Sequence, residues 1–597
     1  MNRSRTSLLL VSLLLAGLLL SGSGLKARES HLPDDPLSVP IGESDQLWEM
    51  GDLSPGTTGG KVKFSVDRFP KTFNNLLADS RTSTDFTRII MGTGLMAENP
   101  TNGKMTPGMA KSWSVSEDGL QYTFHLRQGL KFSDGESLTA EDVVFTYRQL
   151  VFNSKVKTDK RDILRVDGEL PGVKKIDQRT VRFTLPQPYG PFIRQVSTGI
   201  YPKHRFKNVN AKEFNQSWSR ELASNNPEEI VGAGPFQLAE FVPGERIEME
   251  RNPYYFKVDS KGTQLPYLNG YHAFKVKNND VEFLKFKNGE TDLMRAQIED
   301  MPYLLSHEDD EGWRVSTGGS DEGAAMSSEF LVFNWNTESA ELGKLFEREE
   351  FRQAVSLALD RKRIIDEVFN SFGVEQYGPI SRLSPYHKLS MRDELAYDYA
   401  PGRANELLDE LGYSDEDGDG IRDLPSGNEI KPELIVNAGN RVRTRTARII
   451  ADNLAELGIE LQIKELNFDT FSRRLLGGNY EAGIVSLLAN PVAPWTLSDI
   501  FRSRGPLHLW HPGADANPAD WEKRVDELFE KALRASSFEE RKSYYDEFQE
   551  IYADHLPVIY TAGESFLYAT DERLKNTEEF SRLGTFIDFA EYVWVGN

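Results

Sequence analysis

Cysteine is absent from this chain of 597 residues. Its absence excludes disulfide bonds, thiolate metal sites, a thiol nucleophile and any lipid anchor attached through sulfur. Positive charge is also scarce, because 70 Lys and Arg stand against 92 Asp and Glu, which gives a formal net charge of −22. A nucleic-acid-binding protein needs a basic surface that displaces counterions from phosphates, so this balance argues against nucleic acid as a partner.

Local motifs that mark common enzyme classes are missing as well. The sequence has no Gly-x-Ser-x-Gly turn, no Gly-x-x-x-x-Gly-Lys phosphate loop and no His-Glu-x-x-His pair. Its nine histidines are scattered, and the closest two are His508 and His511. Two histidines at this spacing could share a metal ion, but no third ligand is visible in the sequence. A loop that packs on Trp510 is therefore the favoured interpretation.

Long apolar runs are absent apart from one near the start of the chain. Leu8–Leu20 is too short to span a bilayer as a helix, which needs about 20 residues. Arg3 and Arg5 precede the run, and small residues follow it, so residues 1–27 are predicted to be an export signal peptide. An uncleaved anchor is the alternative. Residues 28–60 are polar and rich in Pro and Gly, which predicts a linker.

Patterns of strand and helix alternate along the rest of the chain. Residues with every second side chain apolar predict strands at 61–66, 122–127, 180–185, 459–463 and 558–560. Helical spacing and capping residues predict helices that begin at Thr139 and Ser537, and helices over 401–411 and 443–457. Helices and strands mixed over this length indicate an α/β protein with more than one core.

One acidic loop is the best candidate for a metal site. Four acids occupy positions 1, 3, 5 and 9 of a calcium-type loop: Asp415, Asp417, Asp419 and Asp423. Gly420 stands at position 6, where the chain must turn, but position 12 is Ser426 instead of a bidentate Glu. The sequence leaves two interpretations open, a structural calcium ion that clamps the loop or a solvated turn without any ion.

Several segments together carry a specific family resemblance. The longest runs over 107–135, from Pro-Gly-Met-Ala-Lys-Ser-Trp to Phe-Ser-Asp-Gly, and continues in Leu-Thr-Ala-Glu-Asp-Val-Val at 138–144. It closely resembles the signature of the bacterial extracellular solute-binding proteins of family 5, the peptide-type receptors of ATP-driven importers. The resemblance extends over about residues 61–595 and includes the segments 251–255, 287–293, 333–336, 351–361 and 404–408.

The resemblance implies a two-lobed α/β fold of the periplasmic binding-protein type, with a hinge and an extra sub-domain in the first lobe. The lobe I core is expected at 61–96, 228–325 and 560–597, the inserted sub-domain at 97–227, and lobe II at 326–559. Proteins of this family do no chemistry on their ligand. The chain is therefore expected to be a receptor without enzymatic activity and without a required cofactor.

The resemblance also implies partners and a location. The expected ligand is an oligopeptide or another small oligomeric solute, and the expected protein partners are the permease subunits of an ABC transporter at the inner membrane. The receptor is expected to be a monomer. Because the chain has no cysteine to carry a lipid, it is expected to be free in the periplasm of a two-membrane cell.

Matching positions suggest three ligand-binding segments. By resemblance, Asp79, Ser80 and Arg81 would offer backbone contacts to an extended ligand, although an exposed loop is an equal alternative. The second segment is Asn334, Trp335 and Asn336, and the third holds Asn490 and Trp495, with Trp510 nearby. The indole rings could stack on apolar side chains or sugar faces, or pack inside the protein.

One departure from the peptide-binding pattern affects the expected ligand. Peptide-binding relatives often carry an acid near the third segment that pairs with the amino terminus of the peptide. Residues 484–498 contain no Asp or Glu, and Asp499 follows directly. An oligosaccharide receptor of the same fold therefore stays open as an alternative. An exported hydrolase, and a receptor that presents its ligand to a membrane sensor, are the remaining alternatives.

Overall fold

The computed structural model describes residues 53–98, 105–317, 327–381, 384–388, 390, 397–488, 494–535, 538–578 and 586–596, all within the unit 33–597. The predicted signal peptide and most of the predicted linker lie outside the described residues, as do Asn490 and Ser537. No helix among the described residues is long and apolar enough to cross a membrane.

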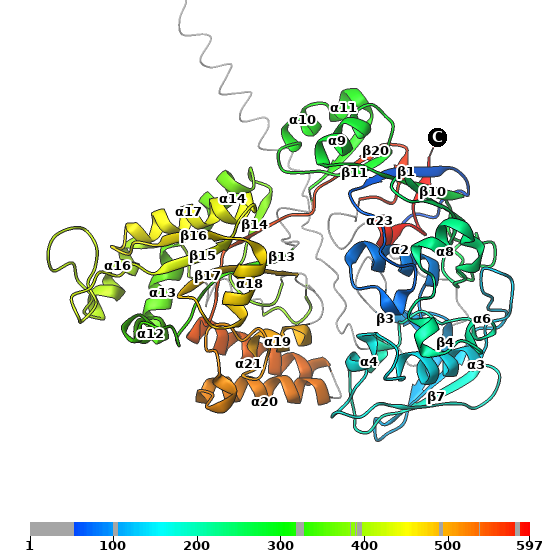
Figure 1. The fold of residues 1–597 in the computed structure, drawn as a ribbon, viewed down its shortest axis with the longest axis horizontal. Helices are drawn as coiled ribbons and strands as arrows, with labels where there is room; N and C mark the ends of the chain where they lie inside the picture. Colours follow the sequence, from blue (N-terminus) through cyan, green and yellow to red (C-terminus); the bar gives the residue numbers. More distant parts are fainter. Residues whose placement is uncertain are drawn as a thin grey trace, which may run out of the picture. The chain divides into compact units, whose positions relative to one another are not determined.

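A seven-stranded mixed sheet gathers strands from both ends of the chain (Figure 1). In spatial order its strands are β12 (Trp313–Ser316), β20 (Tyr568–Asp571), β11 (Leu293–Arg295), β1 (Lys61–Val66), β10 (Gly270–Lys275), β9 (Arg246–Arg251) and β8 (Phe236–Val242). The strand predicted at 61–66 is β1, which runs parallel to β10 and β11. Its alternation places Val62 and Phe64 in the core and Lys61 and Lys63 at the surface.

A five-stranded sheet forms the centre of the second half. In spatial order its strands are β16 (Gln462–Leu466), β15 (Glu433–Asn437), β17 (Ala482–Leu488), β13 (Ser327–Phe333) and β18 (Ile559–Tyr560). Successive residues of β13 enter different cores, because Leu331 and Phe333 belong to one apolar cluster and Phe330 and Val332 to another. The centre of the sheet is therefore buried on both faces, in line with its apolar strands, whereas the edge strand β16 is largely exposed.

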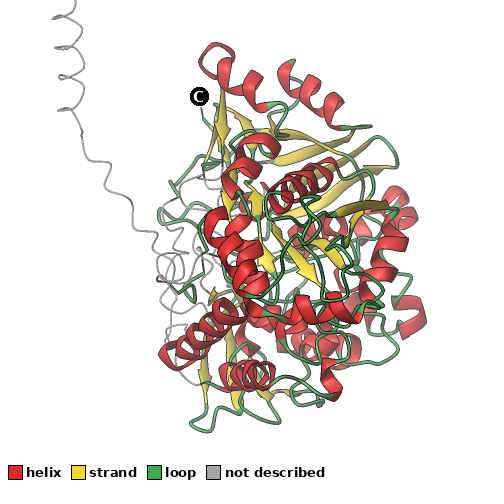
Figure 2. Ribbon diagram, turned by 90° about the vertical axis from the view of Figure 1, so that its left-hand side faces the viewer, coloured by secondary structure: helices red, strands yellow, loops and turns green. Residues whose placement is uncertain are grey.

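Helices cover both faces of the second sheet. Figure 2 shows the helices in red and the strands in yellow. One core receives side chains of α13 (Glu349–Ala358) and α17 (Arg441–Ala455). The other core receives side chains of α20 (Asp520–Arg534) and α21 (Phe538–His555). The other α-helices among the described residues of this half are α12 (Ala340–Glu347), α14 (Arg361–Val368), α16 (Pro401–Glu410), α18 (Phe468–Leu476) and α19 (Ser498–Phe501).

A four-stranded antiparallel sheet is inserted in the chain between β1 and β8 of the first sheet. Its spatial order is β4 (Ala110–Val115), β5 (Gln121–Leu126), β7 (Thr180–Thr184) and β6 (Gly172–Lys175). The predicted capping box is confirmed, since Thr139 N donates to Asp142 Oδ2 at 2.9 Å at the start of α3 (Ala140–Phe145). The short helices of this part of the chain are α4 (Lys160–Ile163), α5 (Phe192–Gln195), α6 (Lys203–Phe206), α7 (Ala211–Phe214) and α8 (Arg220–Asn225).

The other described α-helices and strands come mostly from residues before β13 and after β18. The helices are α2 (Arg81–Met91), α9 (Asn279–Lys287), α10 (Met301–Ser306), α11 (Glu308–Glu311) and α23 (Phe586–Phe589). Three two-stranded sheets pair β2 (Met96–Glu98) with β3 (Met105–Pro107), β14 (Gly373–Glu375) with β19 (Ala562–Glu564), and β21 (Leu574–Lys575) with β22 (Trp594–Val595).

The chain passes between the two main sheets twice. It leaves the first sheet after β12 and enters the second with β13, and it returns between β18 and β20. This topology gives the mixed α/β, two-lobed architecture that the sequence predicts. The predicted residue bounds of the lobes stay a prediction, because sheet membership does not fix where one lobe ends.

Most predicted elements of the second half agree with the structure, and one strand differs. Helix α17 ends before Gly458, whose φ of 71° is the left-handed conformation that closes helices. The following strand, predicted from residue 459, begins only at Gln462. Its ladder partner β15 begins at Glu433, directly after Pro432, so Ile459 and Leu461 are buried outside the ladder.

Candidate ligand-binding site

The first predicted ligand segment forms the start of α2. Ser80 is the N-cap of this helix, and its side chain accepts from Ser83 N at 3.4 Å. Asp79 is exposed and pairs with Lys71 at 3.2 Å, while Arg81 is exposed and lies 3.8 Å from Asp85. Ser80 thus has a structural role, and ligand contact by the three residues stays a prediction.

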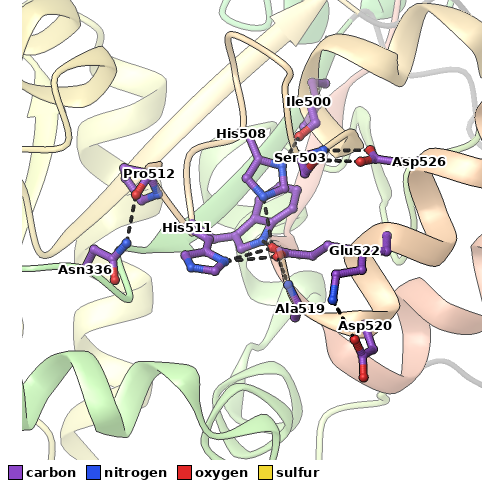
Figure 3. Close-up of polar contacts among 12 residues, drawn as sticks. Asn336, Ile500, Ser503, His508, His511, Pro512, Ala519, Asp520, Glu522 and Asp526 are labelled. Carbon is purple, nitrogen blue, oxygen red and sulfur yellow. Dashed lines mark hydrogen bonds and ion pairs between the residues drawn. The ribbon is translucent and has the colours of Figure 1, made fainter. Parts of the chain in front are cut away.

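The second predicted segment follows β13 and is held by hydrogen bonds within the protein. Asn334 is fully buried, and its Nδ2 donates to Gly478 O at 2.8 Å and to Tyr480 O at 2.9 Å. Asn336 Nδ2 donates to Pro512 O at 2.8 Å (Figure 3). Both amide hydrogens of Asn334 are used, which favours a structural role for this residue. Asn336 is exposed and donates one of its two, so ligand contact by Asn336 stays a prediction.

Trp335 keeps one unused polar group. Its ring lies 4.5 Å from the guanidinium of Arg352 and 5.6 Å from the ring of His511. Its Nε1 is buried and has no hydrogen-bond partner among the described residues. A buried donor without a partner is costly, so Trp335 Nε1 is an unsatisfied polar group of the second segment, and its contact with a ligand stays a prediction.

The two tryptophans of the third segment lie in different surroundings. Trp510 is fully buried, and its Nε1 donates to Glu522 Oε1 at 3.1 Å, so the structure favours the packing alternative for this ring. Trp495 contacts Tyr386 edge-on, and the guanidinium of Arg194 lies 5.9 Å from its ring centre. Arg194 also pairs with Glu98 of β2. Trp495 therefore lies beside charged groups from the first half of the chain.

A second ion pair connects α2 with the end of the chain. Arg88 of α2 pairs with Asp588 of α23 at 2.6 Å. Desolvation opposes the charge on Arg88, but Asp588 and Asp85 together raise its pKa above the usual value. Desolvation also raises the pKa of Glu98, and the neighbouring Arg194 offsets only part of that effect. Sequence reasoning missed these pairs because their partners are far apart in the chain and have no local pattern.

The second sheet holds a buried carboxylate that sequence reasoning also missed. Glu329 of β13 lies 3.6 Å from Arg443 of α17, and both side chains are buried. Burial raises the pKa of Glu329 to about 7, against the lowering effect of Arg443. Glu329 Oε1 has no hydrogen-bond partner among the described residues. The alternation of β13 could have flagged Glu329 as a polar residue on a buried strand.

A cavity of about 1040 Å³ lies in the part of the chain that carries the four-stranded sheet. Its lining includes five lysines: Lys155, Lys157, Lys203, Lys207 and Lys212. None of the predicted ligand-binding residues lines this cavity. It therefore adds no support to the predicted ligand segments.

The acidic loop adopts a turn in which its own backbone contacts the carboxylates. Asp415 accepts from Gly418 N at 2.7 Å and from Gly420 N at 2.8 Å, and these bonds lower its pKa. Ligand oxygens of Asp415, Asp417 and Asp419 lie within 4.8 Å of one another, whereas Asp423 accepts from Glu416 N. All the carboxylates of this loop except that of Asp423 belong to exposed residues, so calcium binding stays a prediction.

Comparison with known proteins places these elements in a family context. The model of the bacterial extracellular solute-binding proteins, family 5 Middle, matches residues 104–507. The chain is 28% identical over 580 residues to a probable ABC transporter-binding protein of Deinococcus radiodurans, covering 92% of this chain and 95% of the relative. It is 27% identical over 566 residues to the oligopeptide-binding protein AppA of Bacillus subtilis, covering 92% of each.

Solved structures share the fold. The structure of AppA from Bacillus subtilis in complex with a nonapeptide matches with a TM-score of 0.65 and 23% identity, covering 91% of this chain and 100% of that chain. The structure of MelB from Agrobacterium fabrum in complex with stachyose matches with a TM-score of 0.66 and 24% identity, covering 91% of this chain and 86% of that chain.

Proposed function

This chain belongs to the bacterial extracellular solute-binding proteins of family 5, and we propose that it binds oligopeptides for delivery to an ABC importer. Its relatives are binding receptors and not enzymes, and the same holds for this chain. The observation that carries the peptide proposal is the similarity to an oligopeptide-binding protein along 92% of both chains.

The proposed ligand position rests on the residues that the two halves of the chain bring together. The Trp495 ring and the Arg194 guanidinium come from different halves of the chain and lie 5.9 Å apart. An indole beside a guanidinium suits a ligand that combines apolar surface with carbonyl acceptors, as a peptide does. In this proposal hinge closure would bury the ligand and present a surface to the permease.

An oligosaccharide is the second candidate ligand. The segment 484–498 has no acid to pair with the amino terminus of a peptide, and a protein of the same fold is described in complex with stachyose. Indole rings stack on the apolar faces of sugars as readily as on peptide side chains. The proposal places the receptor in the periplasm as a monomer, with the inner-membrane permease as its protein partner.

Mass spectrometry of material released from the purified protein by mild denaturation separates the two ligands. Peptides in amounts close to one per chain would support the proposal, and sugars would favour the second candidate. Titration calorimetry with a peptide pool and with a tetrasaccharide then measures each affinity directly. Binding of neither class would contradict both candidates.

Two variants test the proposed contacts. Trp335→Phe keeps an aromatic ring but removes the Nε1 donor, so peptide affinity should fall by about threefold to tenfold if the ligand accepts this hydrogen bond. Trp594→Phe is the matched control, because it removes the Nε1 donor of a tryptophan in the strand β22, outside the predicted segments. Equal affinities for both variants would exclude Trp335 as a hydrogen-bond donor to the ligand.

A further inference from the structure

A cluster of two histidines and a glutamate lies around the buried ring of Trp510. His508 and His511 belong to the loop after α19, and Glu522 lies in the first turn of α20. Figure 3 shows both imidazole rings beside the carboxylate of Glu522. The sequence offers the two histidines without a visible third ligand. The fold supplies it, because Glu522 follows His511 by eleven residues and is the third residue of α20.

The donor atoms of the three side chains converge. His508 Nε2 lies 3.0 Å from Glu522 Oε1, and His511 Nδ1 lies 3.1 Å from Glu522 Oε2. One ligand atom from each of the three residues lies within 4.8 Å of the others. Ligand atoms about 2.0–2.2 Å from a zinc ion lie about 3.3 Å apart at the corners of a tetrahedron. The two nitrogen–oxygen spacings are therefore close to those of a zinc site.

The hydrogen-bond partners of His508 indicate that a positive charge lies between its Nε2 and Glu522 Oε1. His508 Nδ1 lies 3.2 Å from Ile500 O, and a carbonyl oxygen can only accept, so Nδ1 carries a hydrogen. In a neutral ring Nε2 then holds a lone pair, which faces a carboxylate oxygen that also holds only lone pairs. A proton or a metal ion at this position removes the repulsion.

Hydrogen bonds from surrounding residues orient His508 and Glu522, as they orient the ligands of known metal sites. Ile500 O orients the ring of His508 through the nitrogen that does not face Glu522. Glu522 is held by Trp510 Nε1 at 3.1 Å and by Ala519 N at 2.8 Å. His508 and Glu522 therefore have their orientations fixed before any ion binds.

Burial and access also suit an ion. The side chains of Glu522 and His508 are 0% and 4% exposed, whereas that of His511 is 22% exposed. An ion could enter from the His511 side and keep a water molecule as its fourth ligand. Imidazole nitrogens with one carboxylate oxygen favour zinc over the hard cations calcium and magnesium, which prefer oxygen ligands alone.

We propose that His508, His511 and Glu522 form a binding site for a divalent cation of the zinc class. The ion would clamp the loop 507–512 to α20. Two hydrogen bonds connect the same loop to the segment after β13. Trp335 N donates to Trp510 O at 2.8 Å, and Asn336 Nδ2 donates to Pro512 O. The clamp would therefore also fix the segment that follows β13.

The test uses untagged protein that has been treated with chelator and dialysed. Titration calorimetry with Zn²⁺ should show one ion per chain, and Co²⁺ should give the strong visible absorption of a tetrahedral site. His511→Ala and Glu522→Gln should weaken Zn²⁺ binding by about tenfold or more. Asp520→Asn is the control and should leave binding unchanged, because Asp520 lies in the same turn of α20 as Glu522 but its side chain is 99% exposed.

Two results would overturn the proposal. One is the absence of saturable Zn²⁺ binding by the unmodified protein, and the other is binding that survives in both ligand variants. Because the Co²⁺ spectrum is measured on unmodified protein, the test holds even if Glu522→Gln fails to fold. No transported ligand is needed, so the outcome is independent of the proposed function.

Discussion

The buried carboxylate of Glu329 makes the stability of the second half depend on pH. Its pKa is raised from 4.5 to about 7 in the folded protein, chiefly by burial. Well below pH 4.5 the carboxyl is protonated in both states and costs nothing. As the pH rises toward 7 the unfolded chain ionises while the folded protein does not, so stability is lost, and the loss is complete above about pH 7.

The size of this effect follows from the same pKa. One pKa unit corresponds to about 1.4 kcal/mol, so ionisation of Glu329 costs the folded protein about 3 kcal/mol at pH 8. Glu329→Gln keeps the shape of the neutral carboxyl and cannot ionise. The stability of the unmodified protein relative to this variant should therefore fall by about 2–3 kcal/mol between pH 5 and pH 8.

Urea unfolding at pH 5, 6, 7 and 8, followed by tryptophan fluorescence, measures this difference. Glu456→Gln is the matched control, because Glu456 is exposed at the end of the helix that carries Arg443. The control should show no comparable pH dependence. A constant difference between the unmodified protein and Glu329→Gln from pH 5 to pH 8 would refute the reasoning.

Three further predictions concern a buried arginine, the ligand and the acidic loop. Arg352 is 1% exposed and donates to three backbone carbonyls. Arg352→Met leaves these carbonyls without their donor, so it should lower the free energy of unfolding measured in urea by about 3 kcal/mol. An unchanged urea midpoint of unfolding would contradict this prediction. N-acetylation of a bound peptide should change affinity by less than about tenfold in calorimetry, because 484–498 has no acid, whereas a hundredfold loss would reveal one nearby. Millimolar calcium should raise the melting temperature by at most a few degrees, about 1 kcal/mol, and Asp417→Ala should leave ligand binding intact.

The sequence predicts well those elements that depend on local patterns. The alternation at 61–66, the capping box at Thr139 and the glycine after α17 each rest on a few neighbouring residues, and each is confirmed. The predicted start of β16 is wrong because it depends on Pro432, about thirty residues earlier in the chain, where its partner strand begins. A strand's bounds are set by its ladder partner as much as by its own pattern.

The candidate site is harder to predict, because its groups are joined by the fold. Arg88 meets Asp588 and Arg443 meets Glu329 only after distant segments have packed. Trp510 resembles a binding residue because an indole suits both a ligand and a core. The partner of its Nε1 lies in α20, a helix whose packing the sequence does not reveal. Composition and motifs identify the family, whereas pairings across the fold need coordinates.

After the chain crosses back from the second sheet, its strand β20 becomes an interior strand of the first sheet. Strand β20 lies between β11 and β12, and it follows β12 by about 250 residues in the sequence. A chain cut short before Tyr568 would therefore leave β11 at an open edge and β12 without its partner. Exposed strand edges are templates for pairing with other chains. Loss of these last residues would therefore expose strand edges of the first sheet and make the receptor prone to self-association.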